Sequence, residues 1–102
     1  QQINSGGSVA ELQVSTEPAT LTALIATNTG AGDAYLQVWD SETDDVVGDE
    51  LLFSLFIKAG NPGALVFPFV CEKGVYVVMS STAETKTIAS TSAIILAHKK
   101  KR

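Results

Sequence analysis

The chain has 102 residues and is 45% hydrophobic, which suits one globular domain with a single core. Its formal net charge of −4 is unevenly spread, because residues 1–98 hold all the acids and residues 99–102 are all basic. The acidic body disfavours nucleic acid as the main ligand, and the chain shows neither a signal peptide nor an apolar run long enough to span a membrane.

The first third of the chain predicts an arm followed by two strands. Residues 1–8 are polar and rich in glycine and serine, so we predict a flexible N-terminal arm there. Residues 9–16 alternate between apolar and polar side chains, which is typical of a half-buried strand. Residues 19–29 predict a longer strand, whose core face would carry Leu21, Ala23 and Ile25.

The middle of the chain predicts two strands joined by an acidic loop at residues 41–50. Residues 34–40 place Leu36 and Val38 on one face, and two aromatic side chains lie on the other. We therefore expect that second face to be partly covered by a loop or by a neighbouring subunit. Residues 51–58 carry a core stripe formed by Leu51, Phe53, Leu55 and Ile57.

Three further strands are predicted, over residues 64–70, 74–81 and 87–97. The first of them follows a turn rich in glycine and proline, and it would point Leu65, Phe67 and Phe69 to the core. Because Pro68 lacks a backbone donor, this strand should lie at a sheet edge or contain a bulge. Residues 98–102 are predicted to form a basic C-terminal tail outside the domain.

The seven predicted strands are separated by short turns, and no helical periodicity persists between them. This pattern predicts an all-β fold, a single antiparallel β-sandwich of about seven strands over residues 9–97. Both an Ig-like and a jelly-roll-like arrangement fit the pattern. A small closed barrel is the alternative.

Few side chains in the sequence could perform catalysis. Cys71, the only cysteine, lies in an apolar segment, so we predict a small buried hydrophobic residue and no internal disulfide. His98, the only histidine, lies beside the basic end, where a rigid catalytic triad is not expected. We therefore predict that the protein is not an enzyme.

The acidic loop is the strongest local feature, with six carboxylates between Asp40 and Glu50. Calcium takes six to eight oxygen ligands, so a calcium site is one interpretation. It would use Asp40, Glu42, Asp44 and Asp45. The EF-hand pattern fails, because the glycine and the glutamate that it requires are missing at their positions in the loop. The other interpretations are a solvated loop and a contact with a basic patch on a partner, so no cofactor is predicted.

Two other features leave alternatives open. The basic residues 99–102 fit a solvated end, a contact with an acidic neighbour such as the acidic loop of another copy, or a contact with nucleic acid. Tyr35, Trp39 and Phe56 fall on the faces opposite the predicted core. They fit either packing beneath a loop or an interface with another protein, because aromatic residues are enriched at interfaces.

Three segments of the chain read TLTALIATNTGAGDAYLQVWDS, LFSLFIKAGNPGALVFPF and GVYVVMSSTAETKT. Taken together, they resemble small β-sandwich virion structural proteins of tailed bacteriophages. The resemblance implies a homo-oligomeric component of the virion, either a capsid decoration protein or a small tail or fibre subunit, that docks on other virion proteins. It also implies that Ser80–Thr87 is an inert connection. A carbohydrate- or ligand-binding module, assisted by calcium, is the alternative function.

Overall fold

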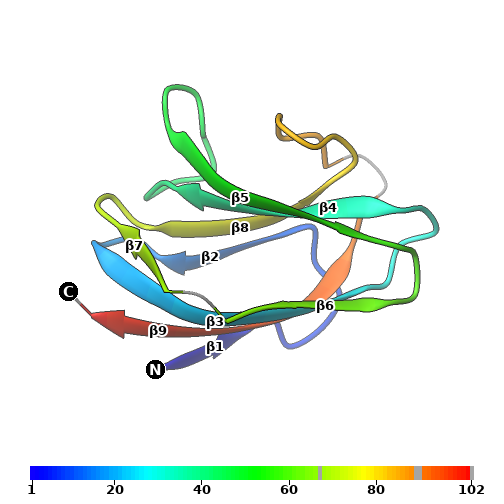
Figure 1. The fold of residues 1–102 in the computed structure, drawn as a ribbon, viewed down its shortest axis with the longest axis horizontal. Coiled ribbons are helices and arrows are strands. Elements are labelled where there is room, and N and C mark those ends of the chain that lie inside the picture. Colours follow the sequence, from blue (N-terminus) through cyan, green and yellow to red (C-terminus); the bar gives the residue numbers. More distant parts are fainter. Residues whose placement is uncertain (67, 89–90, 102) are drawn as a thin grey trace.

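The structure, a computed structural model, describes residues 1–66, 68–88 and 91–101. These residues form antiparallel strands in two sheets that pack face to face, which confirms the predicted all-β sandwich (Figure 1). The strands are β1 (Gln2–Asn4), β2 (Glu11–Ser15), β3 (Ala19–Asn28), β4 (Ala34–Asp40), β5 (Glu50–Ile57), β6 (Pro62–Leu65), β7 (Phe69–Cys71), β8 (Val75–Ser80) and β9 (Ala93–Lys101). No helix among the described residues is long and apolar enough to cross a membrane.

The two sheets have different strand orders. Sheet A has the order β1-β9-β3-β6, and β7 pairs with β3 beside β6. Sheet B has the order β2-β8-β4-β5 and lies above sheet A in Figure 1. The hydrogen-bonded strands therefore form two sheets and not one closed barrel, and each sheet has two edges.

The main core lies between the sheets and is mostly aliphatic. Its fully buried side chains include Leu24 of β3, Leu36 and Val38 of β4, Val77 of β8 and Ile95 of β9. Burying one such side chain stabilises the fold by about 1.5–3 kcal/mol. Cys71 is also fully buried in this core, as predicted.

A bulge in β3 overturns part of the predicted core face. Leu21 points inward as expected, but the pairing of β3 with β9 slips between Leu21 and Ala23. The alternation of faces reverses after this slip, so that Leu24 is fully buried and Ile25 is 46% exposed. The prediction that Ile25 faces the core is therefore wrong, because a bulge adds one unpaired residue without any change in composition.

A second bulge changes the predicted stripe of β5. Phe53, Leu55 and Ile57 pack on the main core, as predicted. The pairing with β4 slips between Leu51 and Phe53, so Leu52 takes the core side and Leu51 packs on the opposite face. The prediction for Leu51 is wrong for the same reason as that for Ile25.

Both ends of the chain belong to sheet A, in contrast to the predicted arm at 1–8 and tail at 98–102. Residues 2–4 form β1, which pairs with β9, and Ile3 packs on the core. Residues 98–101 continue β9 and pair along their length with β3, while His98 pairs with β1 and Lys99 bonds to Gln1 on the other side. These backbone partners explain why this polar segment is ordered as a strand. Arg102 lies outside the described residues.

The predicted strand over residues 64–70 is divided into β6 and β7. Among the described residues, both pair only with β3, so the expected edge position of this segment is confirmed. Leu65 is buried and Phe69 packs on the core, whereas Phe67 lies outside the described residues. The last strand was predicted to start at Thr87, but β9 begins at Ala93. Residues 89–90 lie outside the described residues.

Candidate functional site

The outer face of sheet B is covered by two loops, at residues 41–49 and 81–88. Trp39, Tyr76 and Val78 form a second buried cluster beneath these loops. Every residue of β8 is therefore buried, because its even-numbered side chains pack under the loops and its odd-numbered ones on the main core. The expected cover of the second face of β4 is confirmed, and loops of the same chain supply it.

Gln37 of β4 holds the loop at residues 81–88 against the sheet. Its side-chain Nε2 donates to the backbone oxygens of Thr82 and Thr85, at 2.9 Å each, and to that of Ala83 at 3.2 Å. Its Oε1 accepts a hydrogen bond from Trp39 Nε1 at 3.0 Å. One fully buried amide therefore ties the loop to the indole beneath it.

Hydroxyl groups complete this connection. Ser80 Oγ donates to the Thr85 oxygen at 2.7 Å and accepts from the backbone nitrogens of Thr87 at 2.9 Å and Thr82 at 3.2 Å. Thr82 Oγ1 also donates to the Thr85 oxygen, at 2.7 Å. The segment predicted to be an inert connection is thus an ordered cover, and its small polar side chains provide the hydrogen bonds that hold it.

Asp40 anchors the acidic loop at its start. Its Oδ1 accepts hydrogen bonds from the backbone nitrogens of Lys73 at 2.9 Å and Gly74 at 3.4 Å, and its Oδ2 accepts one from Glu72 at 3.1 Å. Lys73 Nζ also lies 2.6 Å from Asp49 Oδ1, at the far end of the loop. The hydrogen bond from Lys73, with a smaller one from Ser41, holds the pKa of Asp49 below its ordinary value.

The carboxylates proposed as calcium ligands do not converge. Asp40 accepts three backbone hydrogen bonds, and Asp45 accepts one from the Val47 nitrogen at 3.1 Å. Among residues 1–66, 68–88 and 91–101, no three histidine, cysteine, aspartate or glutamate side chains are grouped so that they could hold a metal ion. Asp40 therefore serves the turn before β8, and a calcium site formed by Asp40, Glu42, Asp44 and Asp45 stays a prediction.

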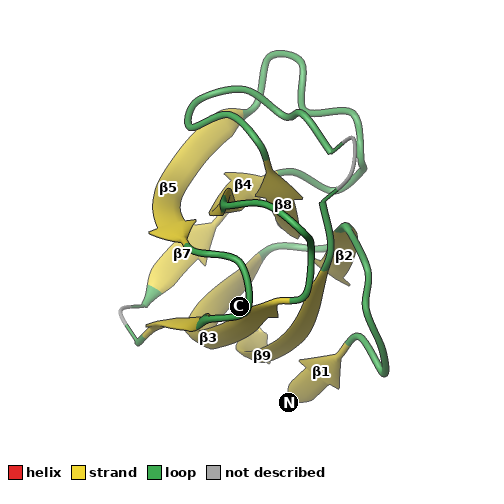
Figure 2. Cartoon of the chain, turned by 90° about the vertical axis from the view of Figure 1, so that its right-hand side faces the viewer, coloured by secondary structure: helices red, strands yellow, loops and turns green. Residues whose placement is uncertain are grey.

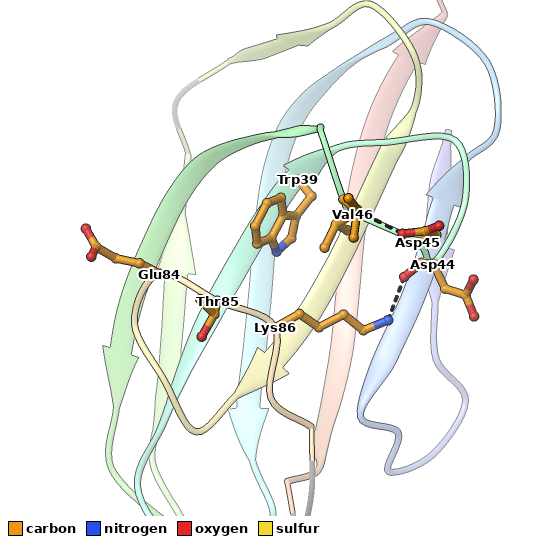
Figure 3. Close-up of a pocket in the computed structure, with 8 residues that line it drawn as sticks. Trp39, Asp44, Asp45, Val46, Glu84, Thr85 and Lys86 are labelled. Carbon is orange, nitrogen blue, oxygen red and sulfur yellow. Dashed lines mark hydrogen bonds between the residues drawn. The ribbon is translucent and has the colours of Figure 1, made fainter.

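A pocket of about 370 Å³ opens between the two loops, with Trp39 at its base (Figure 3). Its other lining residues are Asp44, Asp45, Val46, Val47, Glu84, Thr85 and Lys86. Lys86 Nζ donates to the backbone oxygen of Asp44 at 2.7 Å, and the dashed line in Figure 3 marks this bond. The pocket thus combines an apolar base with an acidic rim, and the lysine bridges the two loops.

The ammonium group of Lys86 contacts Glu11 and the ring of Tyr76. Its Nζ lies 3.6 Å from Glu11 Oε1 and 4.8 Å from the centre of the Tyr76 ring. Tyr76 donates a hydrogen bond to the Glu11 carboxylate. Burial raises the pKa of Tyr76 well above its ordinary value, and the hydrogen bond to Glu11 is the second-largest cause of this rise. Lys86 and Tyr76 therefore stabilise the cover of sheet B.

The three predicted interface residues fall into two groups. Tyr35 and Phe56 lie directly opposite each other on β4 and β5, with ring centres 5.4 Å apart in an edge-to-face arrangement. Phe56 is 50% exposed, so it remains available to a partner. Trp39 is only 7% exposed and packs beneath the loops, which fits the alternative of packing beneath a loop for this residue.

A further surface was missed in the sequence. Ile25 of β3 and Ile94 of β9, which is 50% exposed, lie on the outer face of sheet A. Leu96 and Ala64 flank Ile25 on the two neighbouring strands. The apolar outer face, defined as Ile25, Ala64, Ile94 and Leu96, was hidden from the sequence pattern because the β3 bulge reverses the direction of Ile25.

The chain was compared with protein-family models, with curated proteins and with solved structures, and none of the three comparisons found a match.

Proposed function

We propose that the protein is a non-enzymatic structural component of a bacteriophage virion, either a capsid decoration protein or a small tail or fibre subunit. It acts by self-association and by docking on other proteins of the particle. The phage resemblance of the sequence motivates the virion setting. The apolar outer face of sheet A is the observation that carries the docking role.

The apolar outer face differs from the scattered exposed hydrophobic residues that every protein has. Ile25, Leu96 and Ala64 occupy one row across three adjacent strands, and Ile94 lies next to this row. Contiguous exposed apolar side chains on a small soluble domain mark a protein interaction site. The sandwich can bury this face against a lattice of other subunits without any rearrangement of its own core.

A small face of this kind suits repeated attachment. Each copy contributes a modest interface, and a ring or cluster of copies attaches far more strongly than one copy does. Self-association and docking therefore support each other in this proposal. Neither activity requires a catalytic group or a cofactor.

The test is co-sedimentation with virions of the phage that encodes the chain, followed by electron microscopy of the particles. The unmodified protein should sediment with the particles, and Ile94→Lys should lose this binding because it places a charge on the apolar outer face. Val47→Lys is the matched control, because Val47 is 89% exposed on the acidic loop. Failure of the unmodified protein to bind, or equal binding by Ile94→Lys, contradicts the proposed docking.

A second candidate function is ligand binding at the pocket above Trp39. The favouring observation is the lining itself, in which an indole and three carboxylates surround a space of about 370 Å³. Carbohydrates are recognised by aromatic surfaces together with polar groups that orient their hydroxyls. Trp39 is the only tryptophan, so its fluorescence can report oligosaccharide binding with and without calcium. An unchanged spectrum at saturating oligosaccharide speaks against this function.

A further inference from the structure

The four sheet edges of the sandwich are not equally protected. In sheet A, β1 has only three residues, and the β6–β7 edge is short, interrupted and contains Pro62. In sheet B, β2 has five residues and an irregular register. Strand β5 has eight residues, and its sequence ELLFSLFI contains no proline, glycine or basic residue. Natural proteins protect exposed edges with such devices, and β5 lacks them apart from its bulge near Leu52.

The pairing of sheet B shows which backbone groups of β5 face outward. Met79 N donates to Ala10 O, so the peptide groups of Met79 point away from β4. Opposite residues of an antiparallel pair either exchange both backbone hydrogen bonds or exchange neither. Leu36, opposite Met79, therefore points its N–H and C=O toward β5, and Leu55, opposite Leu36, points its N–H and C=O back toward β4. The backbone groups of successive residues along one strand point to opposite sides.

It follows that the N–H and C=O groups of Ser54 and Phe56 point out of the sheet. Within the described part of the chain, these groups make no backbone hydrogen bond outside the sheet. Strand β5 is an edge strand of sheet B (Figure 2), and no described strand pairs with its outer side. A row of outward N–H and C=O groups is complemented by another extended strand.

The ends of β5 indicate which strand fits. Glu50 and Lys58 are both exposed and flank the strand at opposite ends. The ion pairs of the described residues use Lys73 and Lys86, so Lys58 is not engaged in one of them. An antiparallel copy of β5 brings Glu50 of each chain toward Lys58 of the other, whereas a parallel copy aligns like charges. A second copy of this chain is therefore the complementary partner.

We propose that β5 pairs antiparallel with β5 of a second copy, so that two copies of sheet B form one continuous sheet. Ser54 of each copy faces Phe56 of the other, and the two Leu55 residues meet at the two-fold axis. This register uses the outward groups of Ser54 and Phe56 in both chains and keeps the regular stretch beyond the bulge intact. The inference rests on the proposed function and names the surface through which copies associate.

The pairing also accounts for the exposure of Phe56. Tyr35 of β4 packs against the Phe56 ring, and the side chain of Phe56 remains 50% exposed. In the paired sheet, Phe56 lies across from Ser54 of the second copy, and this contact covers the remaining exposed part of the ring. Phe53, Leu55 and Ile57 keep their places in the core of each sandwich.

The first experiment combines sedimentation velocity with amide hydrogen exchange measured by NMR on the full chain. We expect a species of twice the 10.7 kDa chain mass as concentration rises. The amides of Ser54 and Phe56 should exchange quickly at low concentration and slowly in the dimer. The amide of Leu55, bonded within sheet B, should be slow at both concentrations. A chain that stays monomeric at all concentrations, or a dimer in which the Ser54 and Phe56 amides stay fast, overturns the proposal.

Two variants test the edge directly. Phe56→Lys places a charge in the pairing strand and should weaken the dimer by about 30-fold, the effect of losing a central aromatic contact. Ser54→Pro removes an outward N–H that β4 does not use, and it should also abolish the dimer. Ile94→Lys is the matched control, because Ile94 and Phe56 are equally exposed, at 50% each, on different sheets.

Each result has a defined meaning. Loss of the dimer in both β5 variants but not in Ile94→Lys supports the proposal, and the reverse pattern overturns it. If a β5 variant unfolds, as judged by circular dichroism, the amide exchange of the unmodified chain decides. A monomer that still binds virions contradicts β5 pairing and self-association but leaves the proposed docking intact. A dimer that does not bind virions contradicts the proposed docking and leaves β5 pairing intact.

Discussion

The outer faces of the two sheets differ in how they are covered. Sheet B carries a second buried cluster, around Trp39 and Tyr76, beneath two loops of the same chain. Sheet A leaves Ile25 and Ile94 about half exposed. The outer face of a strand can therefore be buried within the domain or remain exposed to a partner. The outcome depends on whether a neighbouring loop forms hydrogen bonds that hold it over the strand.

The largest expected effect tests whether sheet A is buried on one face only. Leu24→Ala should lower the free energy of unfolding by about 2–5 kcal/mol, because it opens a cavity between the sheets. Ile25→Ala, one residue further along β3, should change it by less than about 0.5 kcal/mol, because that side chain faces solvent. Urea denaturation of both variants measures the difference. Equal losses would show that the outer face of sheet A is covered in solution.

The next largest effect concerns the cover of sheet B. Gln37→Leu should cost about 1–3 kcal/mol, because it removes the partners of the Thr82 and Thr85 oxygens and of the Trp39 N–H. The fluorescence of Trp39 should shift to longer wavelength as the loop loosens. Thr22→Val is the control on sheet A, where an exposed hydroxyl donates to His98 O at 3.0 Å. If the control loses as much stability as Gln37→Leu, the cover is not held by Gln37.

A smaller effect separates two carboxylates of the acidic loop. Asp40→Ala should cost about 1–2 kcal/mol, because its charged oxygens accept the backbone bonds of the turn at Lys73. Glu42→Ala should be nearly neutral, since its side chain is exposed. Thermal denaturation with and without calcium measures both variants. A calcium-dependent rise in stability that both substitutions abolish would support the calcium interpretation.

The smallest effect is a pH dependence at the contact between Asp49 and Lys73. The pKa of Asp49 is lowered in the fold from its ordinary value of 3.8, so this pair adds stability at neutral pH and loses it as the pH falls below about 4. The pKa of Lys73 is raised from 10.5, so the same contribution disappears as the pH rises beyond that value. Asp49→Asn should flatten both limbs, and added salt should weaken them. Stability curves that are identical with and without the substitution would show that the contact contributes nothing.

Much of the fold could be predicted because strand periodicity is a local property. The alternation in residues 34–40 correctly separated Leu36 from Trp39, and the composition around Cys71 correctly placed it in the core. The alternation failed after Leu21 and before Phe53, where each strand contains a bulge. A bulge is a property of the pairing of two strands, so no pattern within one strand reveals it.

The site was harder to predict than the fold, because it depends on contacts between distant segments. Gln37 lies 45 residues from Thr82, whose backbone oxygen it binds, and only the fold brings them together. A glutamine between two apolar residues of a predicted core strand was the available signal, since a buried amide requires partners. Phe56 was correctly placed on the outer face of β5, but the free edge beside it follows from the strand order of sheet B.

The joining of the two chain ends has a practical consequence. Gln1 and Lys99 exchange backbone hydrogen bonds, both of 2.9 Å, at one corner of sheet A. Any segment attached before Gln1 or after this part of β9 would therefore leave the domain at that same corner. The corner is thus a natural attachment point for displayed cargo.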